Sequence, residues 1–175
     1  MSEFRLLPHP DIPAARVKAV AATLRRTQDV LTLAYRVEGA AAVRWPTPAA
    51  PDRTEGLWRT TCFELFLRFD DGERYVEFNF SPSTQWAAYA FDGYREGMAD
   101  LPLAVPPQVA PTSDGVAVAL DLTGLPRGDM AMALSAVIEE AGGTKSYWSL
   151  AHPPGAPDFH HAACFAARLP PPDVS

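Results

Sequence analysis

The chain has 175 residues, a formal net charge of -6 at pH 7 and a sequence pI near 5.1. The acidic balance argues against nucleic acid or an anionic membrane surface as a partner, because both are recognised by a basic surface. No apolar run is long enough for a membrane span or a signal peptide. We therefore expect a cytoplasmic protein.

Prolines divide the chain into segments that show the alternation of β-strands. The sequence holds 18 prolines, and proline is excluded from central strands because it has no N–H to donate. Residues 129–141 also suit a helix in their alanine and methionine content, but alternating apolar residues and the following Gly142-Gly143 favour a strand. We expect strands at residues 17–26, 30–37, 62–69, 75–81, 86–91, 115–122, 130–138, 146–151 and 163–169.

Two of these segments, CFELFLRF and YVEFNFS, form a hairpin whose register the sequence specifies. They flank Asp71-Gly72, a dipeptide that favours a tight turn. Closing the pair around this turn makes one face wholly apolar, because a slip of one residue would turn the apolar set to the other side. The apolar face pairs Phe63 with Phe80, Leu65 with Phe78 and Leu67 with Val76. The other face pairs Glu64 with Asn79, Phe66 with Glu77 and Arg68 with Tyr75.

Many short strands with little helix indicate an all-β fold. We expect residues 1–175 to form a single antiparallel β-sandwich domain of jelly-roll type, with residues 170–175 as a tail. A domain of this size buries enough surface to fold without disulfides. We therefore expect Cys62 and Cys164 to be reduced thiols in or near the core.

Three runs of residues resemble a known family. They are LWRTTCFELFL, YVEFNFSPSTQWAAYAFDGYR and SYWSLAHPPGAPDFHHAACF, and they look like the DOMON-like domains that are similar to family 9 carbohydrate-binding modules. The resemblance implies a jelly-roll-like β-sandwich that binds sugars or haem. Family 9 sugar binders hold a terminal sugar between two tryptophans while a glutamate grips its hydroxyls, and the spacing of Trp58 and Glu64 resembles that arrangement. For the second tryptophan we favour Trp148 over Trp86.

The candidate ligand site combines aromatic and polar side chains. Indole rings pack on the C–H face of a sugar, while charged and amide groups bond its hydroxyls. Each residue also has a structural alternative, because tryptophans are often core residues and Glu64 can form a surface ion pair with Arg59 or Arg68. We expect the site to contain Trp58, Arg59, Glu64, Asn79 and Trp148, bordered by His152 or His160.

Residues 152–161, HPPGAPDFHH, hold the chain's only cluster of potential metal ligands. We expect these side chains to bond backbone groups rather than a metal, because their spacing matches no specific metal motif. For haem, the resemblance implies a methionine and a histidine as ligands, for which Met98 with His152 or His160 is the candidate pair.

An enzyme is the remaining alternative. Glu64 and Glu77 lie diagonally on the polar hairpin face, at about 7 Å, a separation that suits a carboxylate-pair glycoside hydrolase. An open sheet face, however, rarely desolvates a carboxylate enough for general-acid chemistry. The sequence therefore predicts a non-catalytic module for a small sugar-like ligand, without cofactor or metal. A haem or redox-cofactor domain of the same fold comes second and the hydrolase third.

Overall fold

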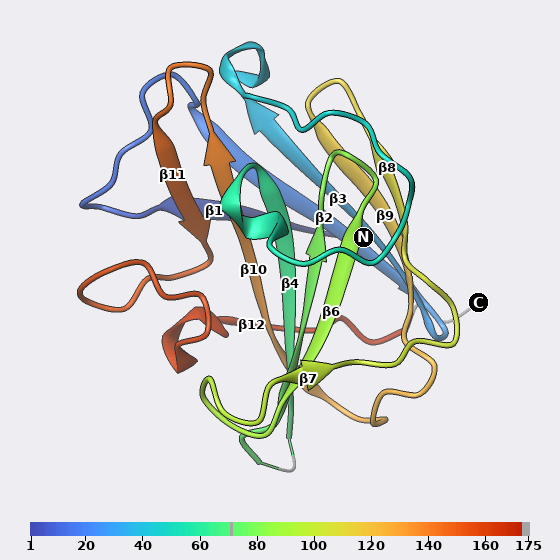
Figure 1. Ribbon diagram of the computed structural model, residues 1–175. Helices are drawn as coiled ribbons and strands as arrows, with labels where there is room; N and C mark the ends of the chain where they lie inside the picture. The colour runs from blue at the N-terminus through green and yellow to red at the C-terminus, as the bar shows by residue number, and fades with distance from the viewer. Residues whose placement is uncertain (71, 173–175) are drawn as a thin grey trace.

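The computed structural model describes residues 1–70 and 72–172, which are built almost entirely of strands (Figure 1). The strands are β1 (Ser2–Pro8), β2 (Ala19–Thr27), β3 (Val30–Glu38), β4 (Cys62–Phe69), β5 (Tyr75–Phe80), β6 (Trp86–Phe91), β7 (Ala99–Asp100), β8 (Gln108–Pro111), β9 (Gly115–Asp121), β10 (Met130–Glu139), β11 (Lys145–Ser149) and β12 (Ala167–Arg168). The described helices are the 3-10 turns η1 (Ala40–Ala42), η2 (Leu57–Arg59) and η3 (Ala162–Cys164). None of these helices has the length and apolarity to cross a membrane. The expectation of an all-β chain with little helix is confirmed.

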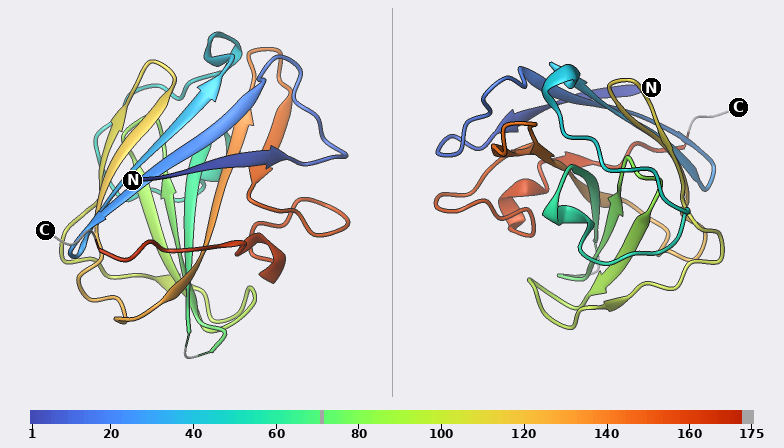
Figure 2. Two further views of the ribbon diagram at one scale, coloured as in Figure 1. Left: turned by 180° about the vertical axis from the view of Figure 1, so that it is seen from behind. Right: turned by 45° about the horizontal axis from the view of Figure 1, so that its top comes forward.

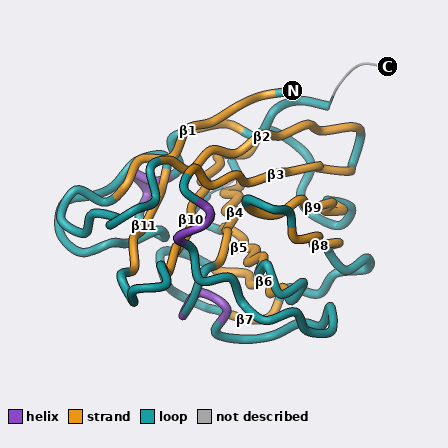
Figure 3. The backbone as a smooth tube through the Cα atoms, turned by 90° about the horizontal axis from the view of Figure 1, so that it is seen from above, coloured by secondary structure: helices purple, strands orange, loops and turns teal. Residues whose placement is uncertain are grey.

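The described strands form one antiparallel sheet that curls into a half-barrel (Figures 2 and 3). Hydrogen bonds link them in the order β7-β6-β5-β4-β10-β11-β1-β2-β3-β9-β8, and β12 pairs with β10 off this path. Strand β1 joins the two halves, because Leu7 and Pro8 pair with β11 whereas residues 2–6 pair with β2. The curl brings the β2-β3-β9 half over the β4-β5-β10 half, so that the two inner faces enclose the main core.

The main core holds the two halves together. Tyr35 from β3 meets Phe63 and Leu65 from β4, and each of the three is fully buried. The rings of Tyr35 and Phe63 stack with their centroids 4.9 Å apart. The Tyr35 hydroxyl also donates to the backbone oxygen of Glu64. Packing and a buried hydrogen bond thus fix β4 from its inner side.

The β4–β5 hairpin has the predicted register. Glu64 lies opposite Asn79 and Leu65 opposite Phe78. The apolar set therefore faces the main core, and the acidic set faces outward from the half-barrel. Asp71 of the predicted turn lies outside the described residues.

Other predicted elements agree in part. Residues 130–138 lie in the strand β10, as favoured over a helix. The predicted strand at 163–169 is wrong for most of its length, because residues 163–164 belong to η3 and only residues 167–168 form the strand β12. Strands β1, β7 and β8 were not predicted, since β7 and β8 are too short for a periodic signal and β1 runs into a proline-rich stretch. Of the expected tail, residues 173–175 lie outside the described residues.

We predict that Leu65→Ala lowers the free energy of unfolding by about 2–5 kcal/mol, because it leaves a cavity between the two halves. Leu65 is fully buried, whereas Leu7 is 52% exposed. The control Leu7→Ala removes the same atoms and should cost much less. Urea titration gives both values, provided that the slope with denaturant is unchanged. Equal losses at the two positions would contradict the placement of Leu65 in the core.

Candidate ligand pocket

A pocket lies on the outer face of strands β4, β5, β6, β10 and β11. Phe159 and Cys164 of the C-terminal segment cover part of this face and form a second, smaller apolar core with it. Beside that core is a cavity of about 500 Å³. It is lined by Trp58, Glu64, Glu77, Tyr89, Phe91, Arg95, Met98, Val137, Tyr147, Pro157, Phe159 and His160. The polar hairpin face is therefore the floor of a pocket and not an open sheet surface.

Glu64 projects from β4 into this pocket and is only 3% exposed. Its Oε2 accepts a hydrogen bond from Ser135 Oγ of β10 at 3.1 Å. Burial, and then the charge of Glu77, raise the pKa of Glu64 well above its ordinary value, while the serine hydrogen bond lowers it in part. Glu64 therefore holds its proton more tightly than an exposed glutamate does.

Glu77 of β5 is the second buried carboxyl, diagonal to Glu64 on the same hairpin face. Burial raises its pKa to about 7, against smaller lowering effects of a hydrogen bond with Asn79 and the charge of Arg95. Its Oε2 lies 3.6 Å from His160 Nε2. Burial also lowers the pKa of His160 to about 4. Near neutral pH the imidazole is thus uncharged and leaves the two carboxyls without a cationic partner from histidine.

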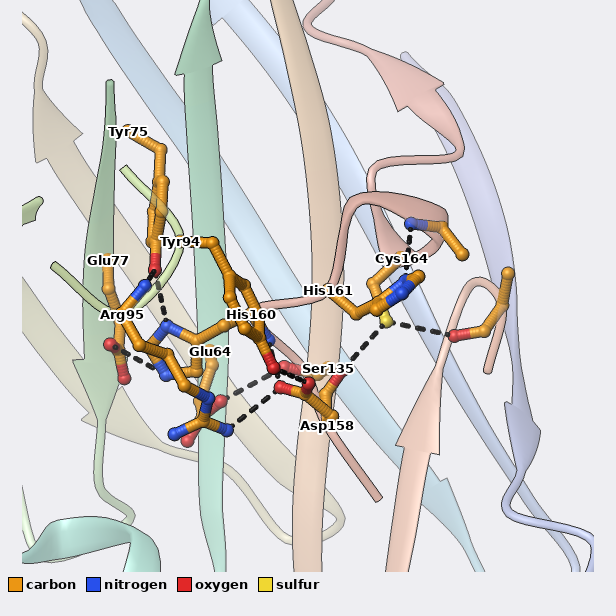
Figure 4. A network of polar contacts seen from close by, with 12 residues as sticks. Glu64, Tyr75, Glu77, Tyr94, Arg95, Ser135, Asp158, His160, His161 and Cys164 are labelled. Carbon is orange, nitrogen blue, oxygen red and sulfur yellow. Dashed lines mark hydrogen bonds and ion pairs between the residues drawn. The ribbon is translucent and has the colours of Figure 1, made fainter. Parts of the chain in front are cut away.

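A hydrogen-bond network holds His160 and Arg95 beside the acids (Figure 4). Tyr75 Oη lies 2.8 Å from His160 Nδ1 and accepts the backbone N–H of Arg95 at 3.2 Å. The Arg95 guanidinium bonds Asp158 at 2.8 Å, and the Tyr94 hydroxyl donates to the same carboxylate. Arg95 has a φ of 55°, in the left-handed region that side chains other than glycine rarely adopt. The network thus joins the loop after β6 to the segment before η3 at one side of the pocket.

Aromatic side chains form much of the remaining wall. Trp58 on η2 is 52% exposed, and the Arg59 guanidinium lies 5.6 Å from its ring centre. The rings of Tyr147 and Phe159 lie with their centroids 6.2 Å apart. An exposed indole beside buried carboxyls gives the pocket both an apolar and a polar surface for a ligand.

The structure brings some of the predicted site residues together. Trp58, Glu64 and His160 all line the pocket. Asn79 is on the same strand face and 1% exposed, but it is not among the lining residues. Its Oδ1 is buried without a hydrogen-bond partner in the described part of the chain.

The predicted clamp of Trp58 with Trp148 is not formed. Trp148 is 3% exposed within the main core, where its Nε1–H donates to Ser146 Oγ at 2.9 Å. Successive side chains of a strand point to opposite faces, so its neighbour Tyr147 reaches the pocket instead. Trp86, the other candidate, also lies in the main core.

Arg59 and His152 also lie away from the pocket lining. The Arg59 side chain rests against Trp58, and its backbone oxygen accepts a hydrogen bond from Lys145. His152 Nε2 lies 2.7 Å from the backbone oxygen of Leu7, and its ring packs edge-on against His9. Two histidines of the proline-rich segment therefore lie apart, His152 at β1 and His160 in the pocket.

The remaining potential metal ligands and the two cysteines have structural positions. His161 Nδ1 accepts the backbone N–H of Ala163 and caps η3. Within residues 1–70 and 72–172, no three His, Cys, Asp or Glu side chains converge to hold a metal ion. Cys62 and Cys164 are both buried and unbridged, as expected from the sequence.

Several pocket residues are not among those predicted from the sequence. Tyr89 lies opposite Glu77, so strand alternation could have placed it on this face, whereas the side of Tyr147 is set by its pairing with Val137 of β10. The loop residues Arg95 and Phe159 have no periodic signal that could have placed them.

We predict that Glu77 lowers stability as the pH rises. Its pKa is about 7 when folded and 4.5 ordinarily, so the folded state binds more protons between these values, and stability falls across that window. Glu77→Gln should reduce this pH dependence and raise the free energy of unfolding at pH 8 by on the order of 3 kcal/mol. Urea titrations from pH 4.5 to 8 measure the effect, with the exposed Glu38→Gln as control. A wild type that gains stability relative to Glu77→Gln as the pH rises would contradict the assignment.

Comparison with known proteins adds evidence on the fold. No protein-family profile and no curated protein matches the chain. The crystal structure of a "putative carbohydrate-binding protein" from Bacteroides uniformis ATCC 8492 is similar, with a TM-score of 0.68 and 15% sequence identity. The match covers 93% of this chain and 83% of that chain. At this identity the likeness establishes a shared fold.

Proposed function

We propose that this protein is a non-catalytic module that binds a small sugar-like ligand in the pocket on the outer face of β4 and β5. The observation that supports the proposal is the convergence of Trp58, Glu64 and Glu77 on one cavity of about 500 Å³. A cavity of this volume is in the range of small-molecule sites.

The lining suits the two surfaces of a sugar. Aromatic rings such as Trp58 and Tyr147 remove water from an apolar C–H patch. Buried carboxyls replace the water that bonds the hydroxyls, and hydrogen bonds to charged groups are the stronger ones. The pocket offers both kinds of group within one volume.

The resemblance to DOMON-like and family 9 modules supports the same proposal, including a jelly-roll-like arrangement of the sheet. Trp58 and Glu64, the two residues that carry the resemblance most closely, both line the pocket. The second aromatic position falls to Tyr147 in place of Trp148. The structural neighbour from Bacteroides uniformis, described as a "putative carbohydrate-binding protein", is consistent with this proposal.

Binding fits the geometry better than hydrolysis does. Carboxylate-pair glycoside hydrolases place their two acids on either side of the scissile bond. Glu64 and Glu77 instead project from the same face of one hairpin. Both acids thus approach a ligand from the pocket floor, an arrangement that suits recognition.

Haem fits the pocket poorly. Met98 and His160 both line it, as the haem alternative requires. However, His160 Nδ1 is bonded to Tyr75 and Nε2 faces Glu77 at 3.6 Å. Iron at Nε2 would have to enter between His160 and the Glu77 carboxyl, and two buried acids oppose the haem propionates. A Soret absorbance in the purified protein would favour haem over this proposal.

A thermal-shift screen with glucose, galactose, cellobiose and glucosamine tests the proposal, because a ligand that binds only the folded state raises Tm. We expect at least one member of such a mono- and disaccharide panel to raise Tm and to quench indole fluorescence. A panel without any hit would overturn the proposal.

Trp58→Ala should weaken the binding of a sugar found in that screen by roughly threefold to tenfold, because an aromatic contact contributes about 0.5–1.5 kcal/mol beyond its buried area. Trp58→Phe keeps an aromatic face and should retain most of the affinity. Calorimetry measures both variants. Because Trp58 is half-exposed, neither change should alter the unfolding midpoint much. Wild-type affinity in Trp58→Ala would remove Trp58 from the site.

A further inference from the structure

The pocket holds two buried carboxyls to which no Lys or Arg of the described residues is bonded. We infer that its ligand is cationic, namely a sugar that carries a protonated amine held by Glu64 and Glu77. This inference rests on the proposed function and specifies the chemical class of the ligand.

Within residues 1–70 and 72–172, both acids are hydrogen-bonded to neutral groups. Glu64 bonds the neutral Ser135, and Glu77 bonds the neutral amide of Asn79. Their exposed fractions are 3% and 6%, so bulk water compensates little of their charge. Two like charges this deeply buried are costly unless a positive group joins them.

The pocket's own cation is already engaged. Among the described lining residues, Arg95 is the one Lys or Arg side chain, and it forms an ion pair with Asp158 at 2.8 Å. His160 is neutral near pH 7, as its lowered pKa shows. One guanidinium thus faces three carboxylates when Glu64 and Glu77 are both ionised.

The other groups of the pocket also suit an ammonium ion. An ammonium is a donor of three hydrogen bonds and accepts none, and the floor is rich in acceptors. These are the carboxyls of Glu64 and Glu77, which both line the pocket. The aromatic rings of Tyr89 and Tyr147 add faces that attract cations. A neutral hexose would leave the two acids protonated, whereas an ammonium group stabilises their ionised forms.

The inference predicts a pH dependence of binding. A permanently charged ligand binds the ionised acids, so its affinity should rise with pH through the pKa of Glu77, which is about 7. The charged and titratable groups around Glu77 are Glu64 and Cys62 of β4, Tyr75 of β5, Tyr89 of β6, His160, Arg95 and Asp158. Binding should also release protons to the buffer.

Calorimetry at pH 7 with glucose, glucosamine and 6-amino-6-deoxyglucose tests the inference. We expect at least one amino sugar to bind at least tenfold more tightly than glucose. Glu64→Gln and Glu77→Gln should remove this preference, whereas the exposed Glu38→Gln should keep it. Choline is permanently charged and has no sugar ring. Its titration into the wild type from pH 6 to 8 tests the predicted rise of affinity with pH without any substitution in the protein.

The outcomes separate this inference from the proposed function. Equal affinity for glucose and both amino sugars would overturn the inference of a cationic ligand and leave the proposed sugar binding in place. An amino-sugar preference that survives both glutamine variants would likewise overturn it. Choline binding that rises with pH, without binding of any sugar, would support a cationic ligand and refute the proposed sugar binding. Absence of binding by every probe would overturn both.

Discussion

The structure depends on the alternation of side chains along β4 and β5. Every residue from Cys62 to Leu67 is buried, so this strand must be covered on both faces. One face packs into the main core through residues such as Leu65 and Phe78. The other presents Glu64 and Glu77, and the loops that cover it turn a sheet surface into a pocket. Because the period is two, a slip of one residue would place both acids in the apolar core.

The two buried acids lower the stability of the folded protein when they are ionised. The surrounding contacts hold their carboxyls in position with neutral groups and supply no bonded cation among the described residues. Tyr75, His160 and Asn79 supply neutral hydrogen-bonding groups around Glu77. Arg95 stands nearby but is held by Asp158. Local destabilisation of this kind is common at functional sites, where a ligand makes the contacts that the protein lacks. The same physics therefore accounts for the raised pKa values and underlies both the predicted pH dependence of stability and the proposed preference for cations.

The sequence predicted the hairpin well because a two-residue period with one wholly apolar face allows a single register. It could not place Trp148, because Tyr147 and Trp148 are adjacent aromatics and either one could have faced the core. The pairing of β11 with β10 determines which of the two faces the main core, and no local sequence pattern predicts this pairing. Arg95 and Phe159 lie in segments without periodicity, so their approach to Glu77 and Tyr147 depends on loop packing. The expected open acidic face became a covered pocket for the same reason.

The most direct test of this account is the titration of the glutamate side-chain carboxyls, followed by NMR with carbon-13 labelling and assigned through Glu64→Gln and Glu77→Gln. The account predicts that Glu77 titrates with a pKa of about 7 and that the pKa of Glu64 lies well above its ordinary value. Addition of a bound amino sugar should lower both, because the ammonium stabilises the ionised forms. Two carboxyls that titrate near 4.5, the ordinary value, and do not respond to any amine would contradict it.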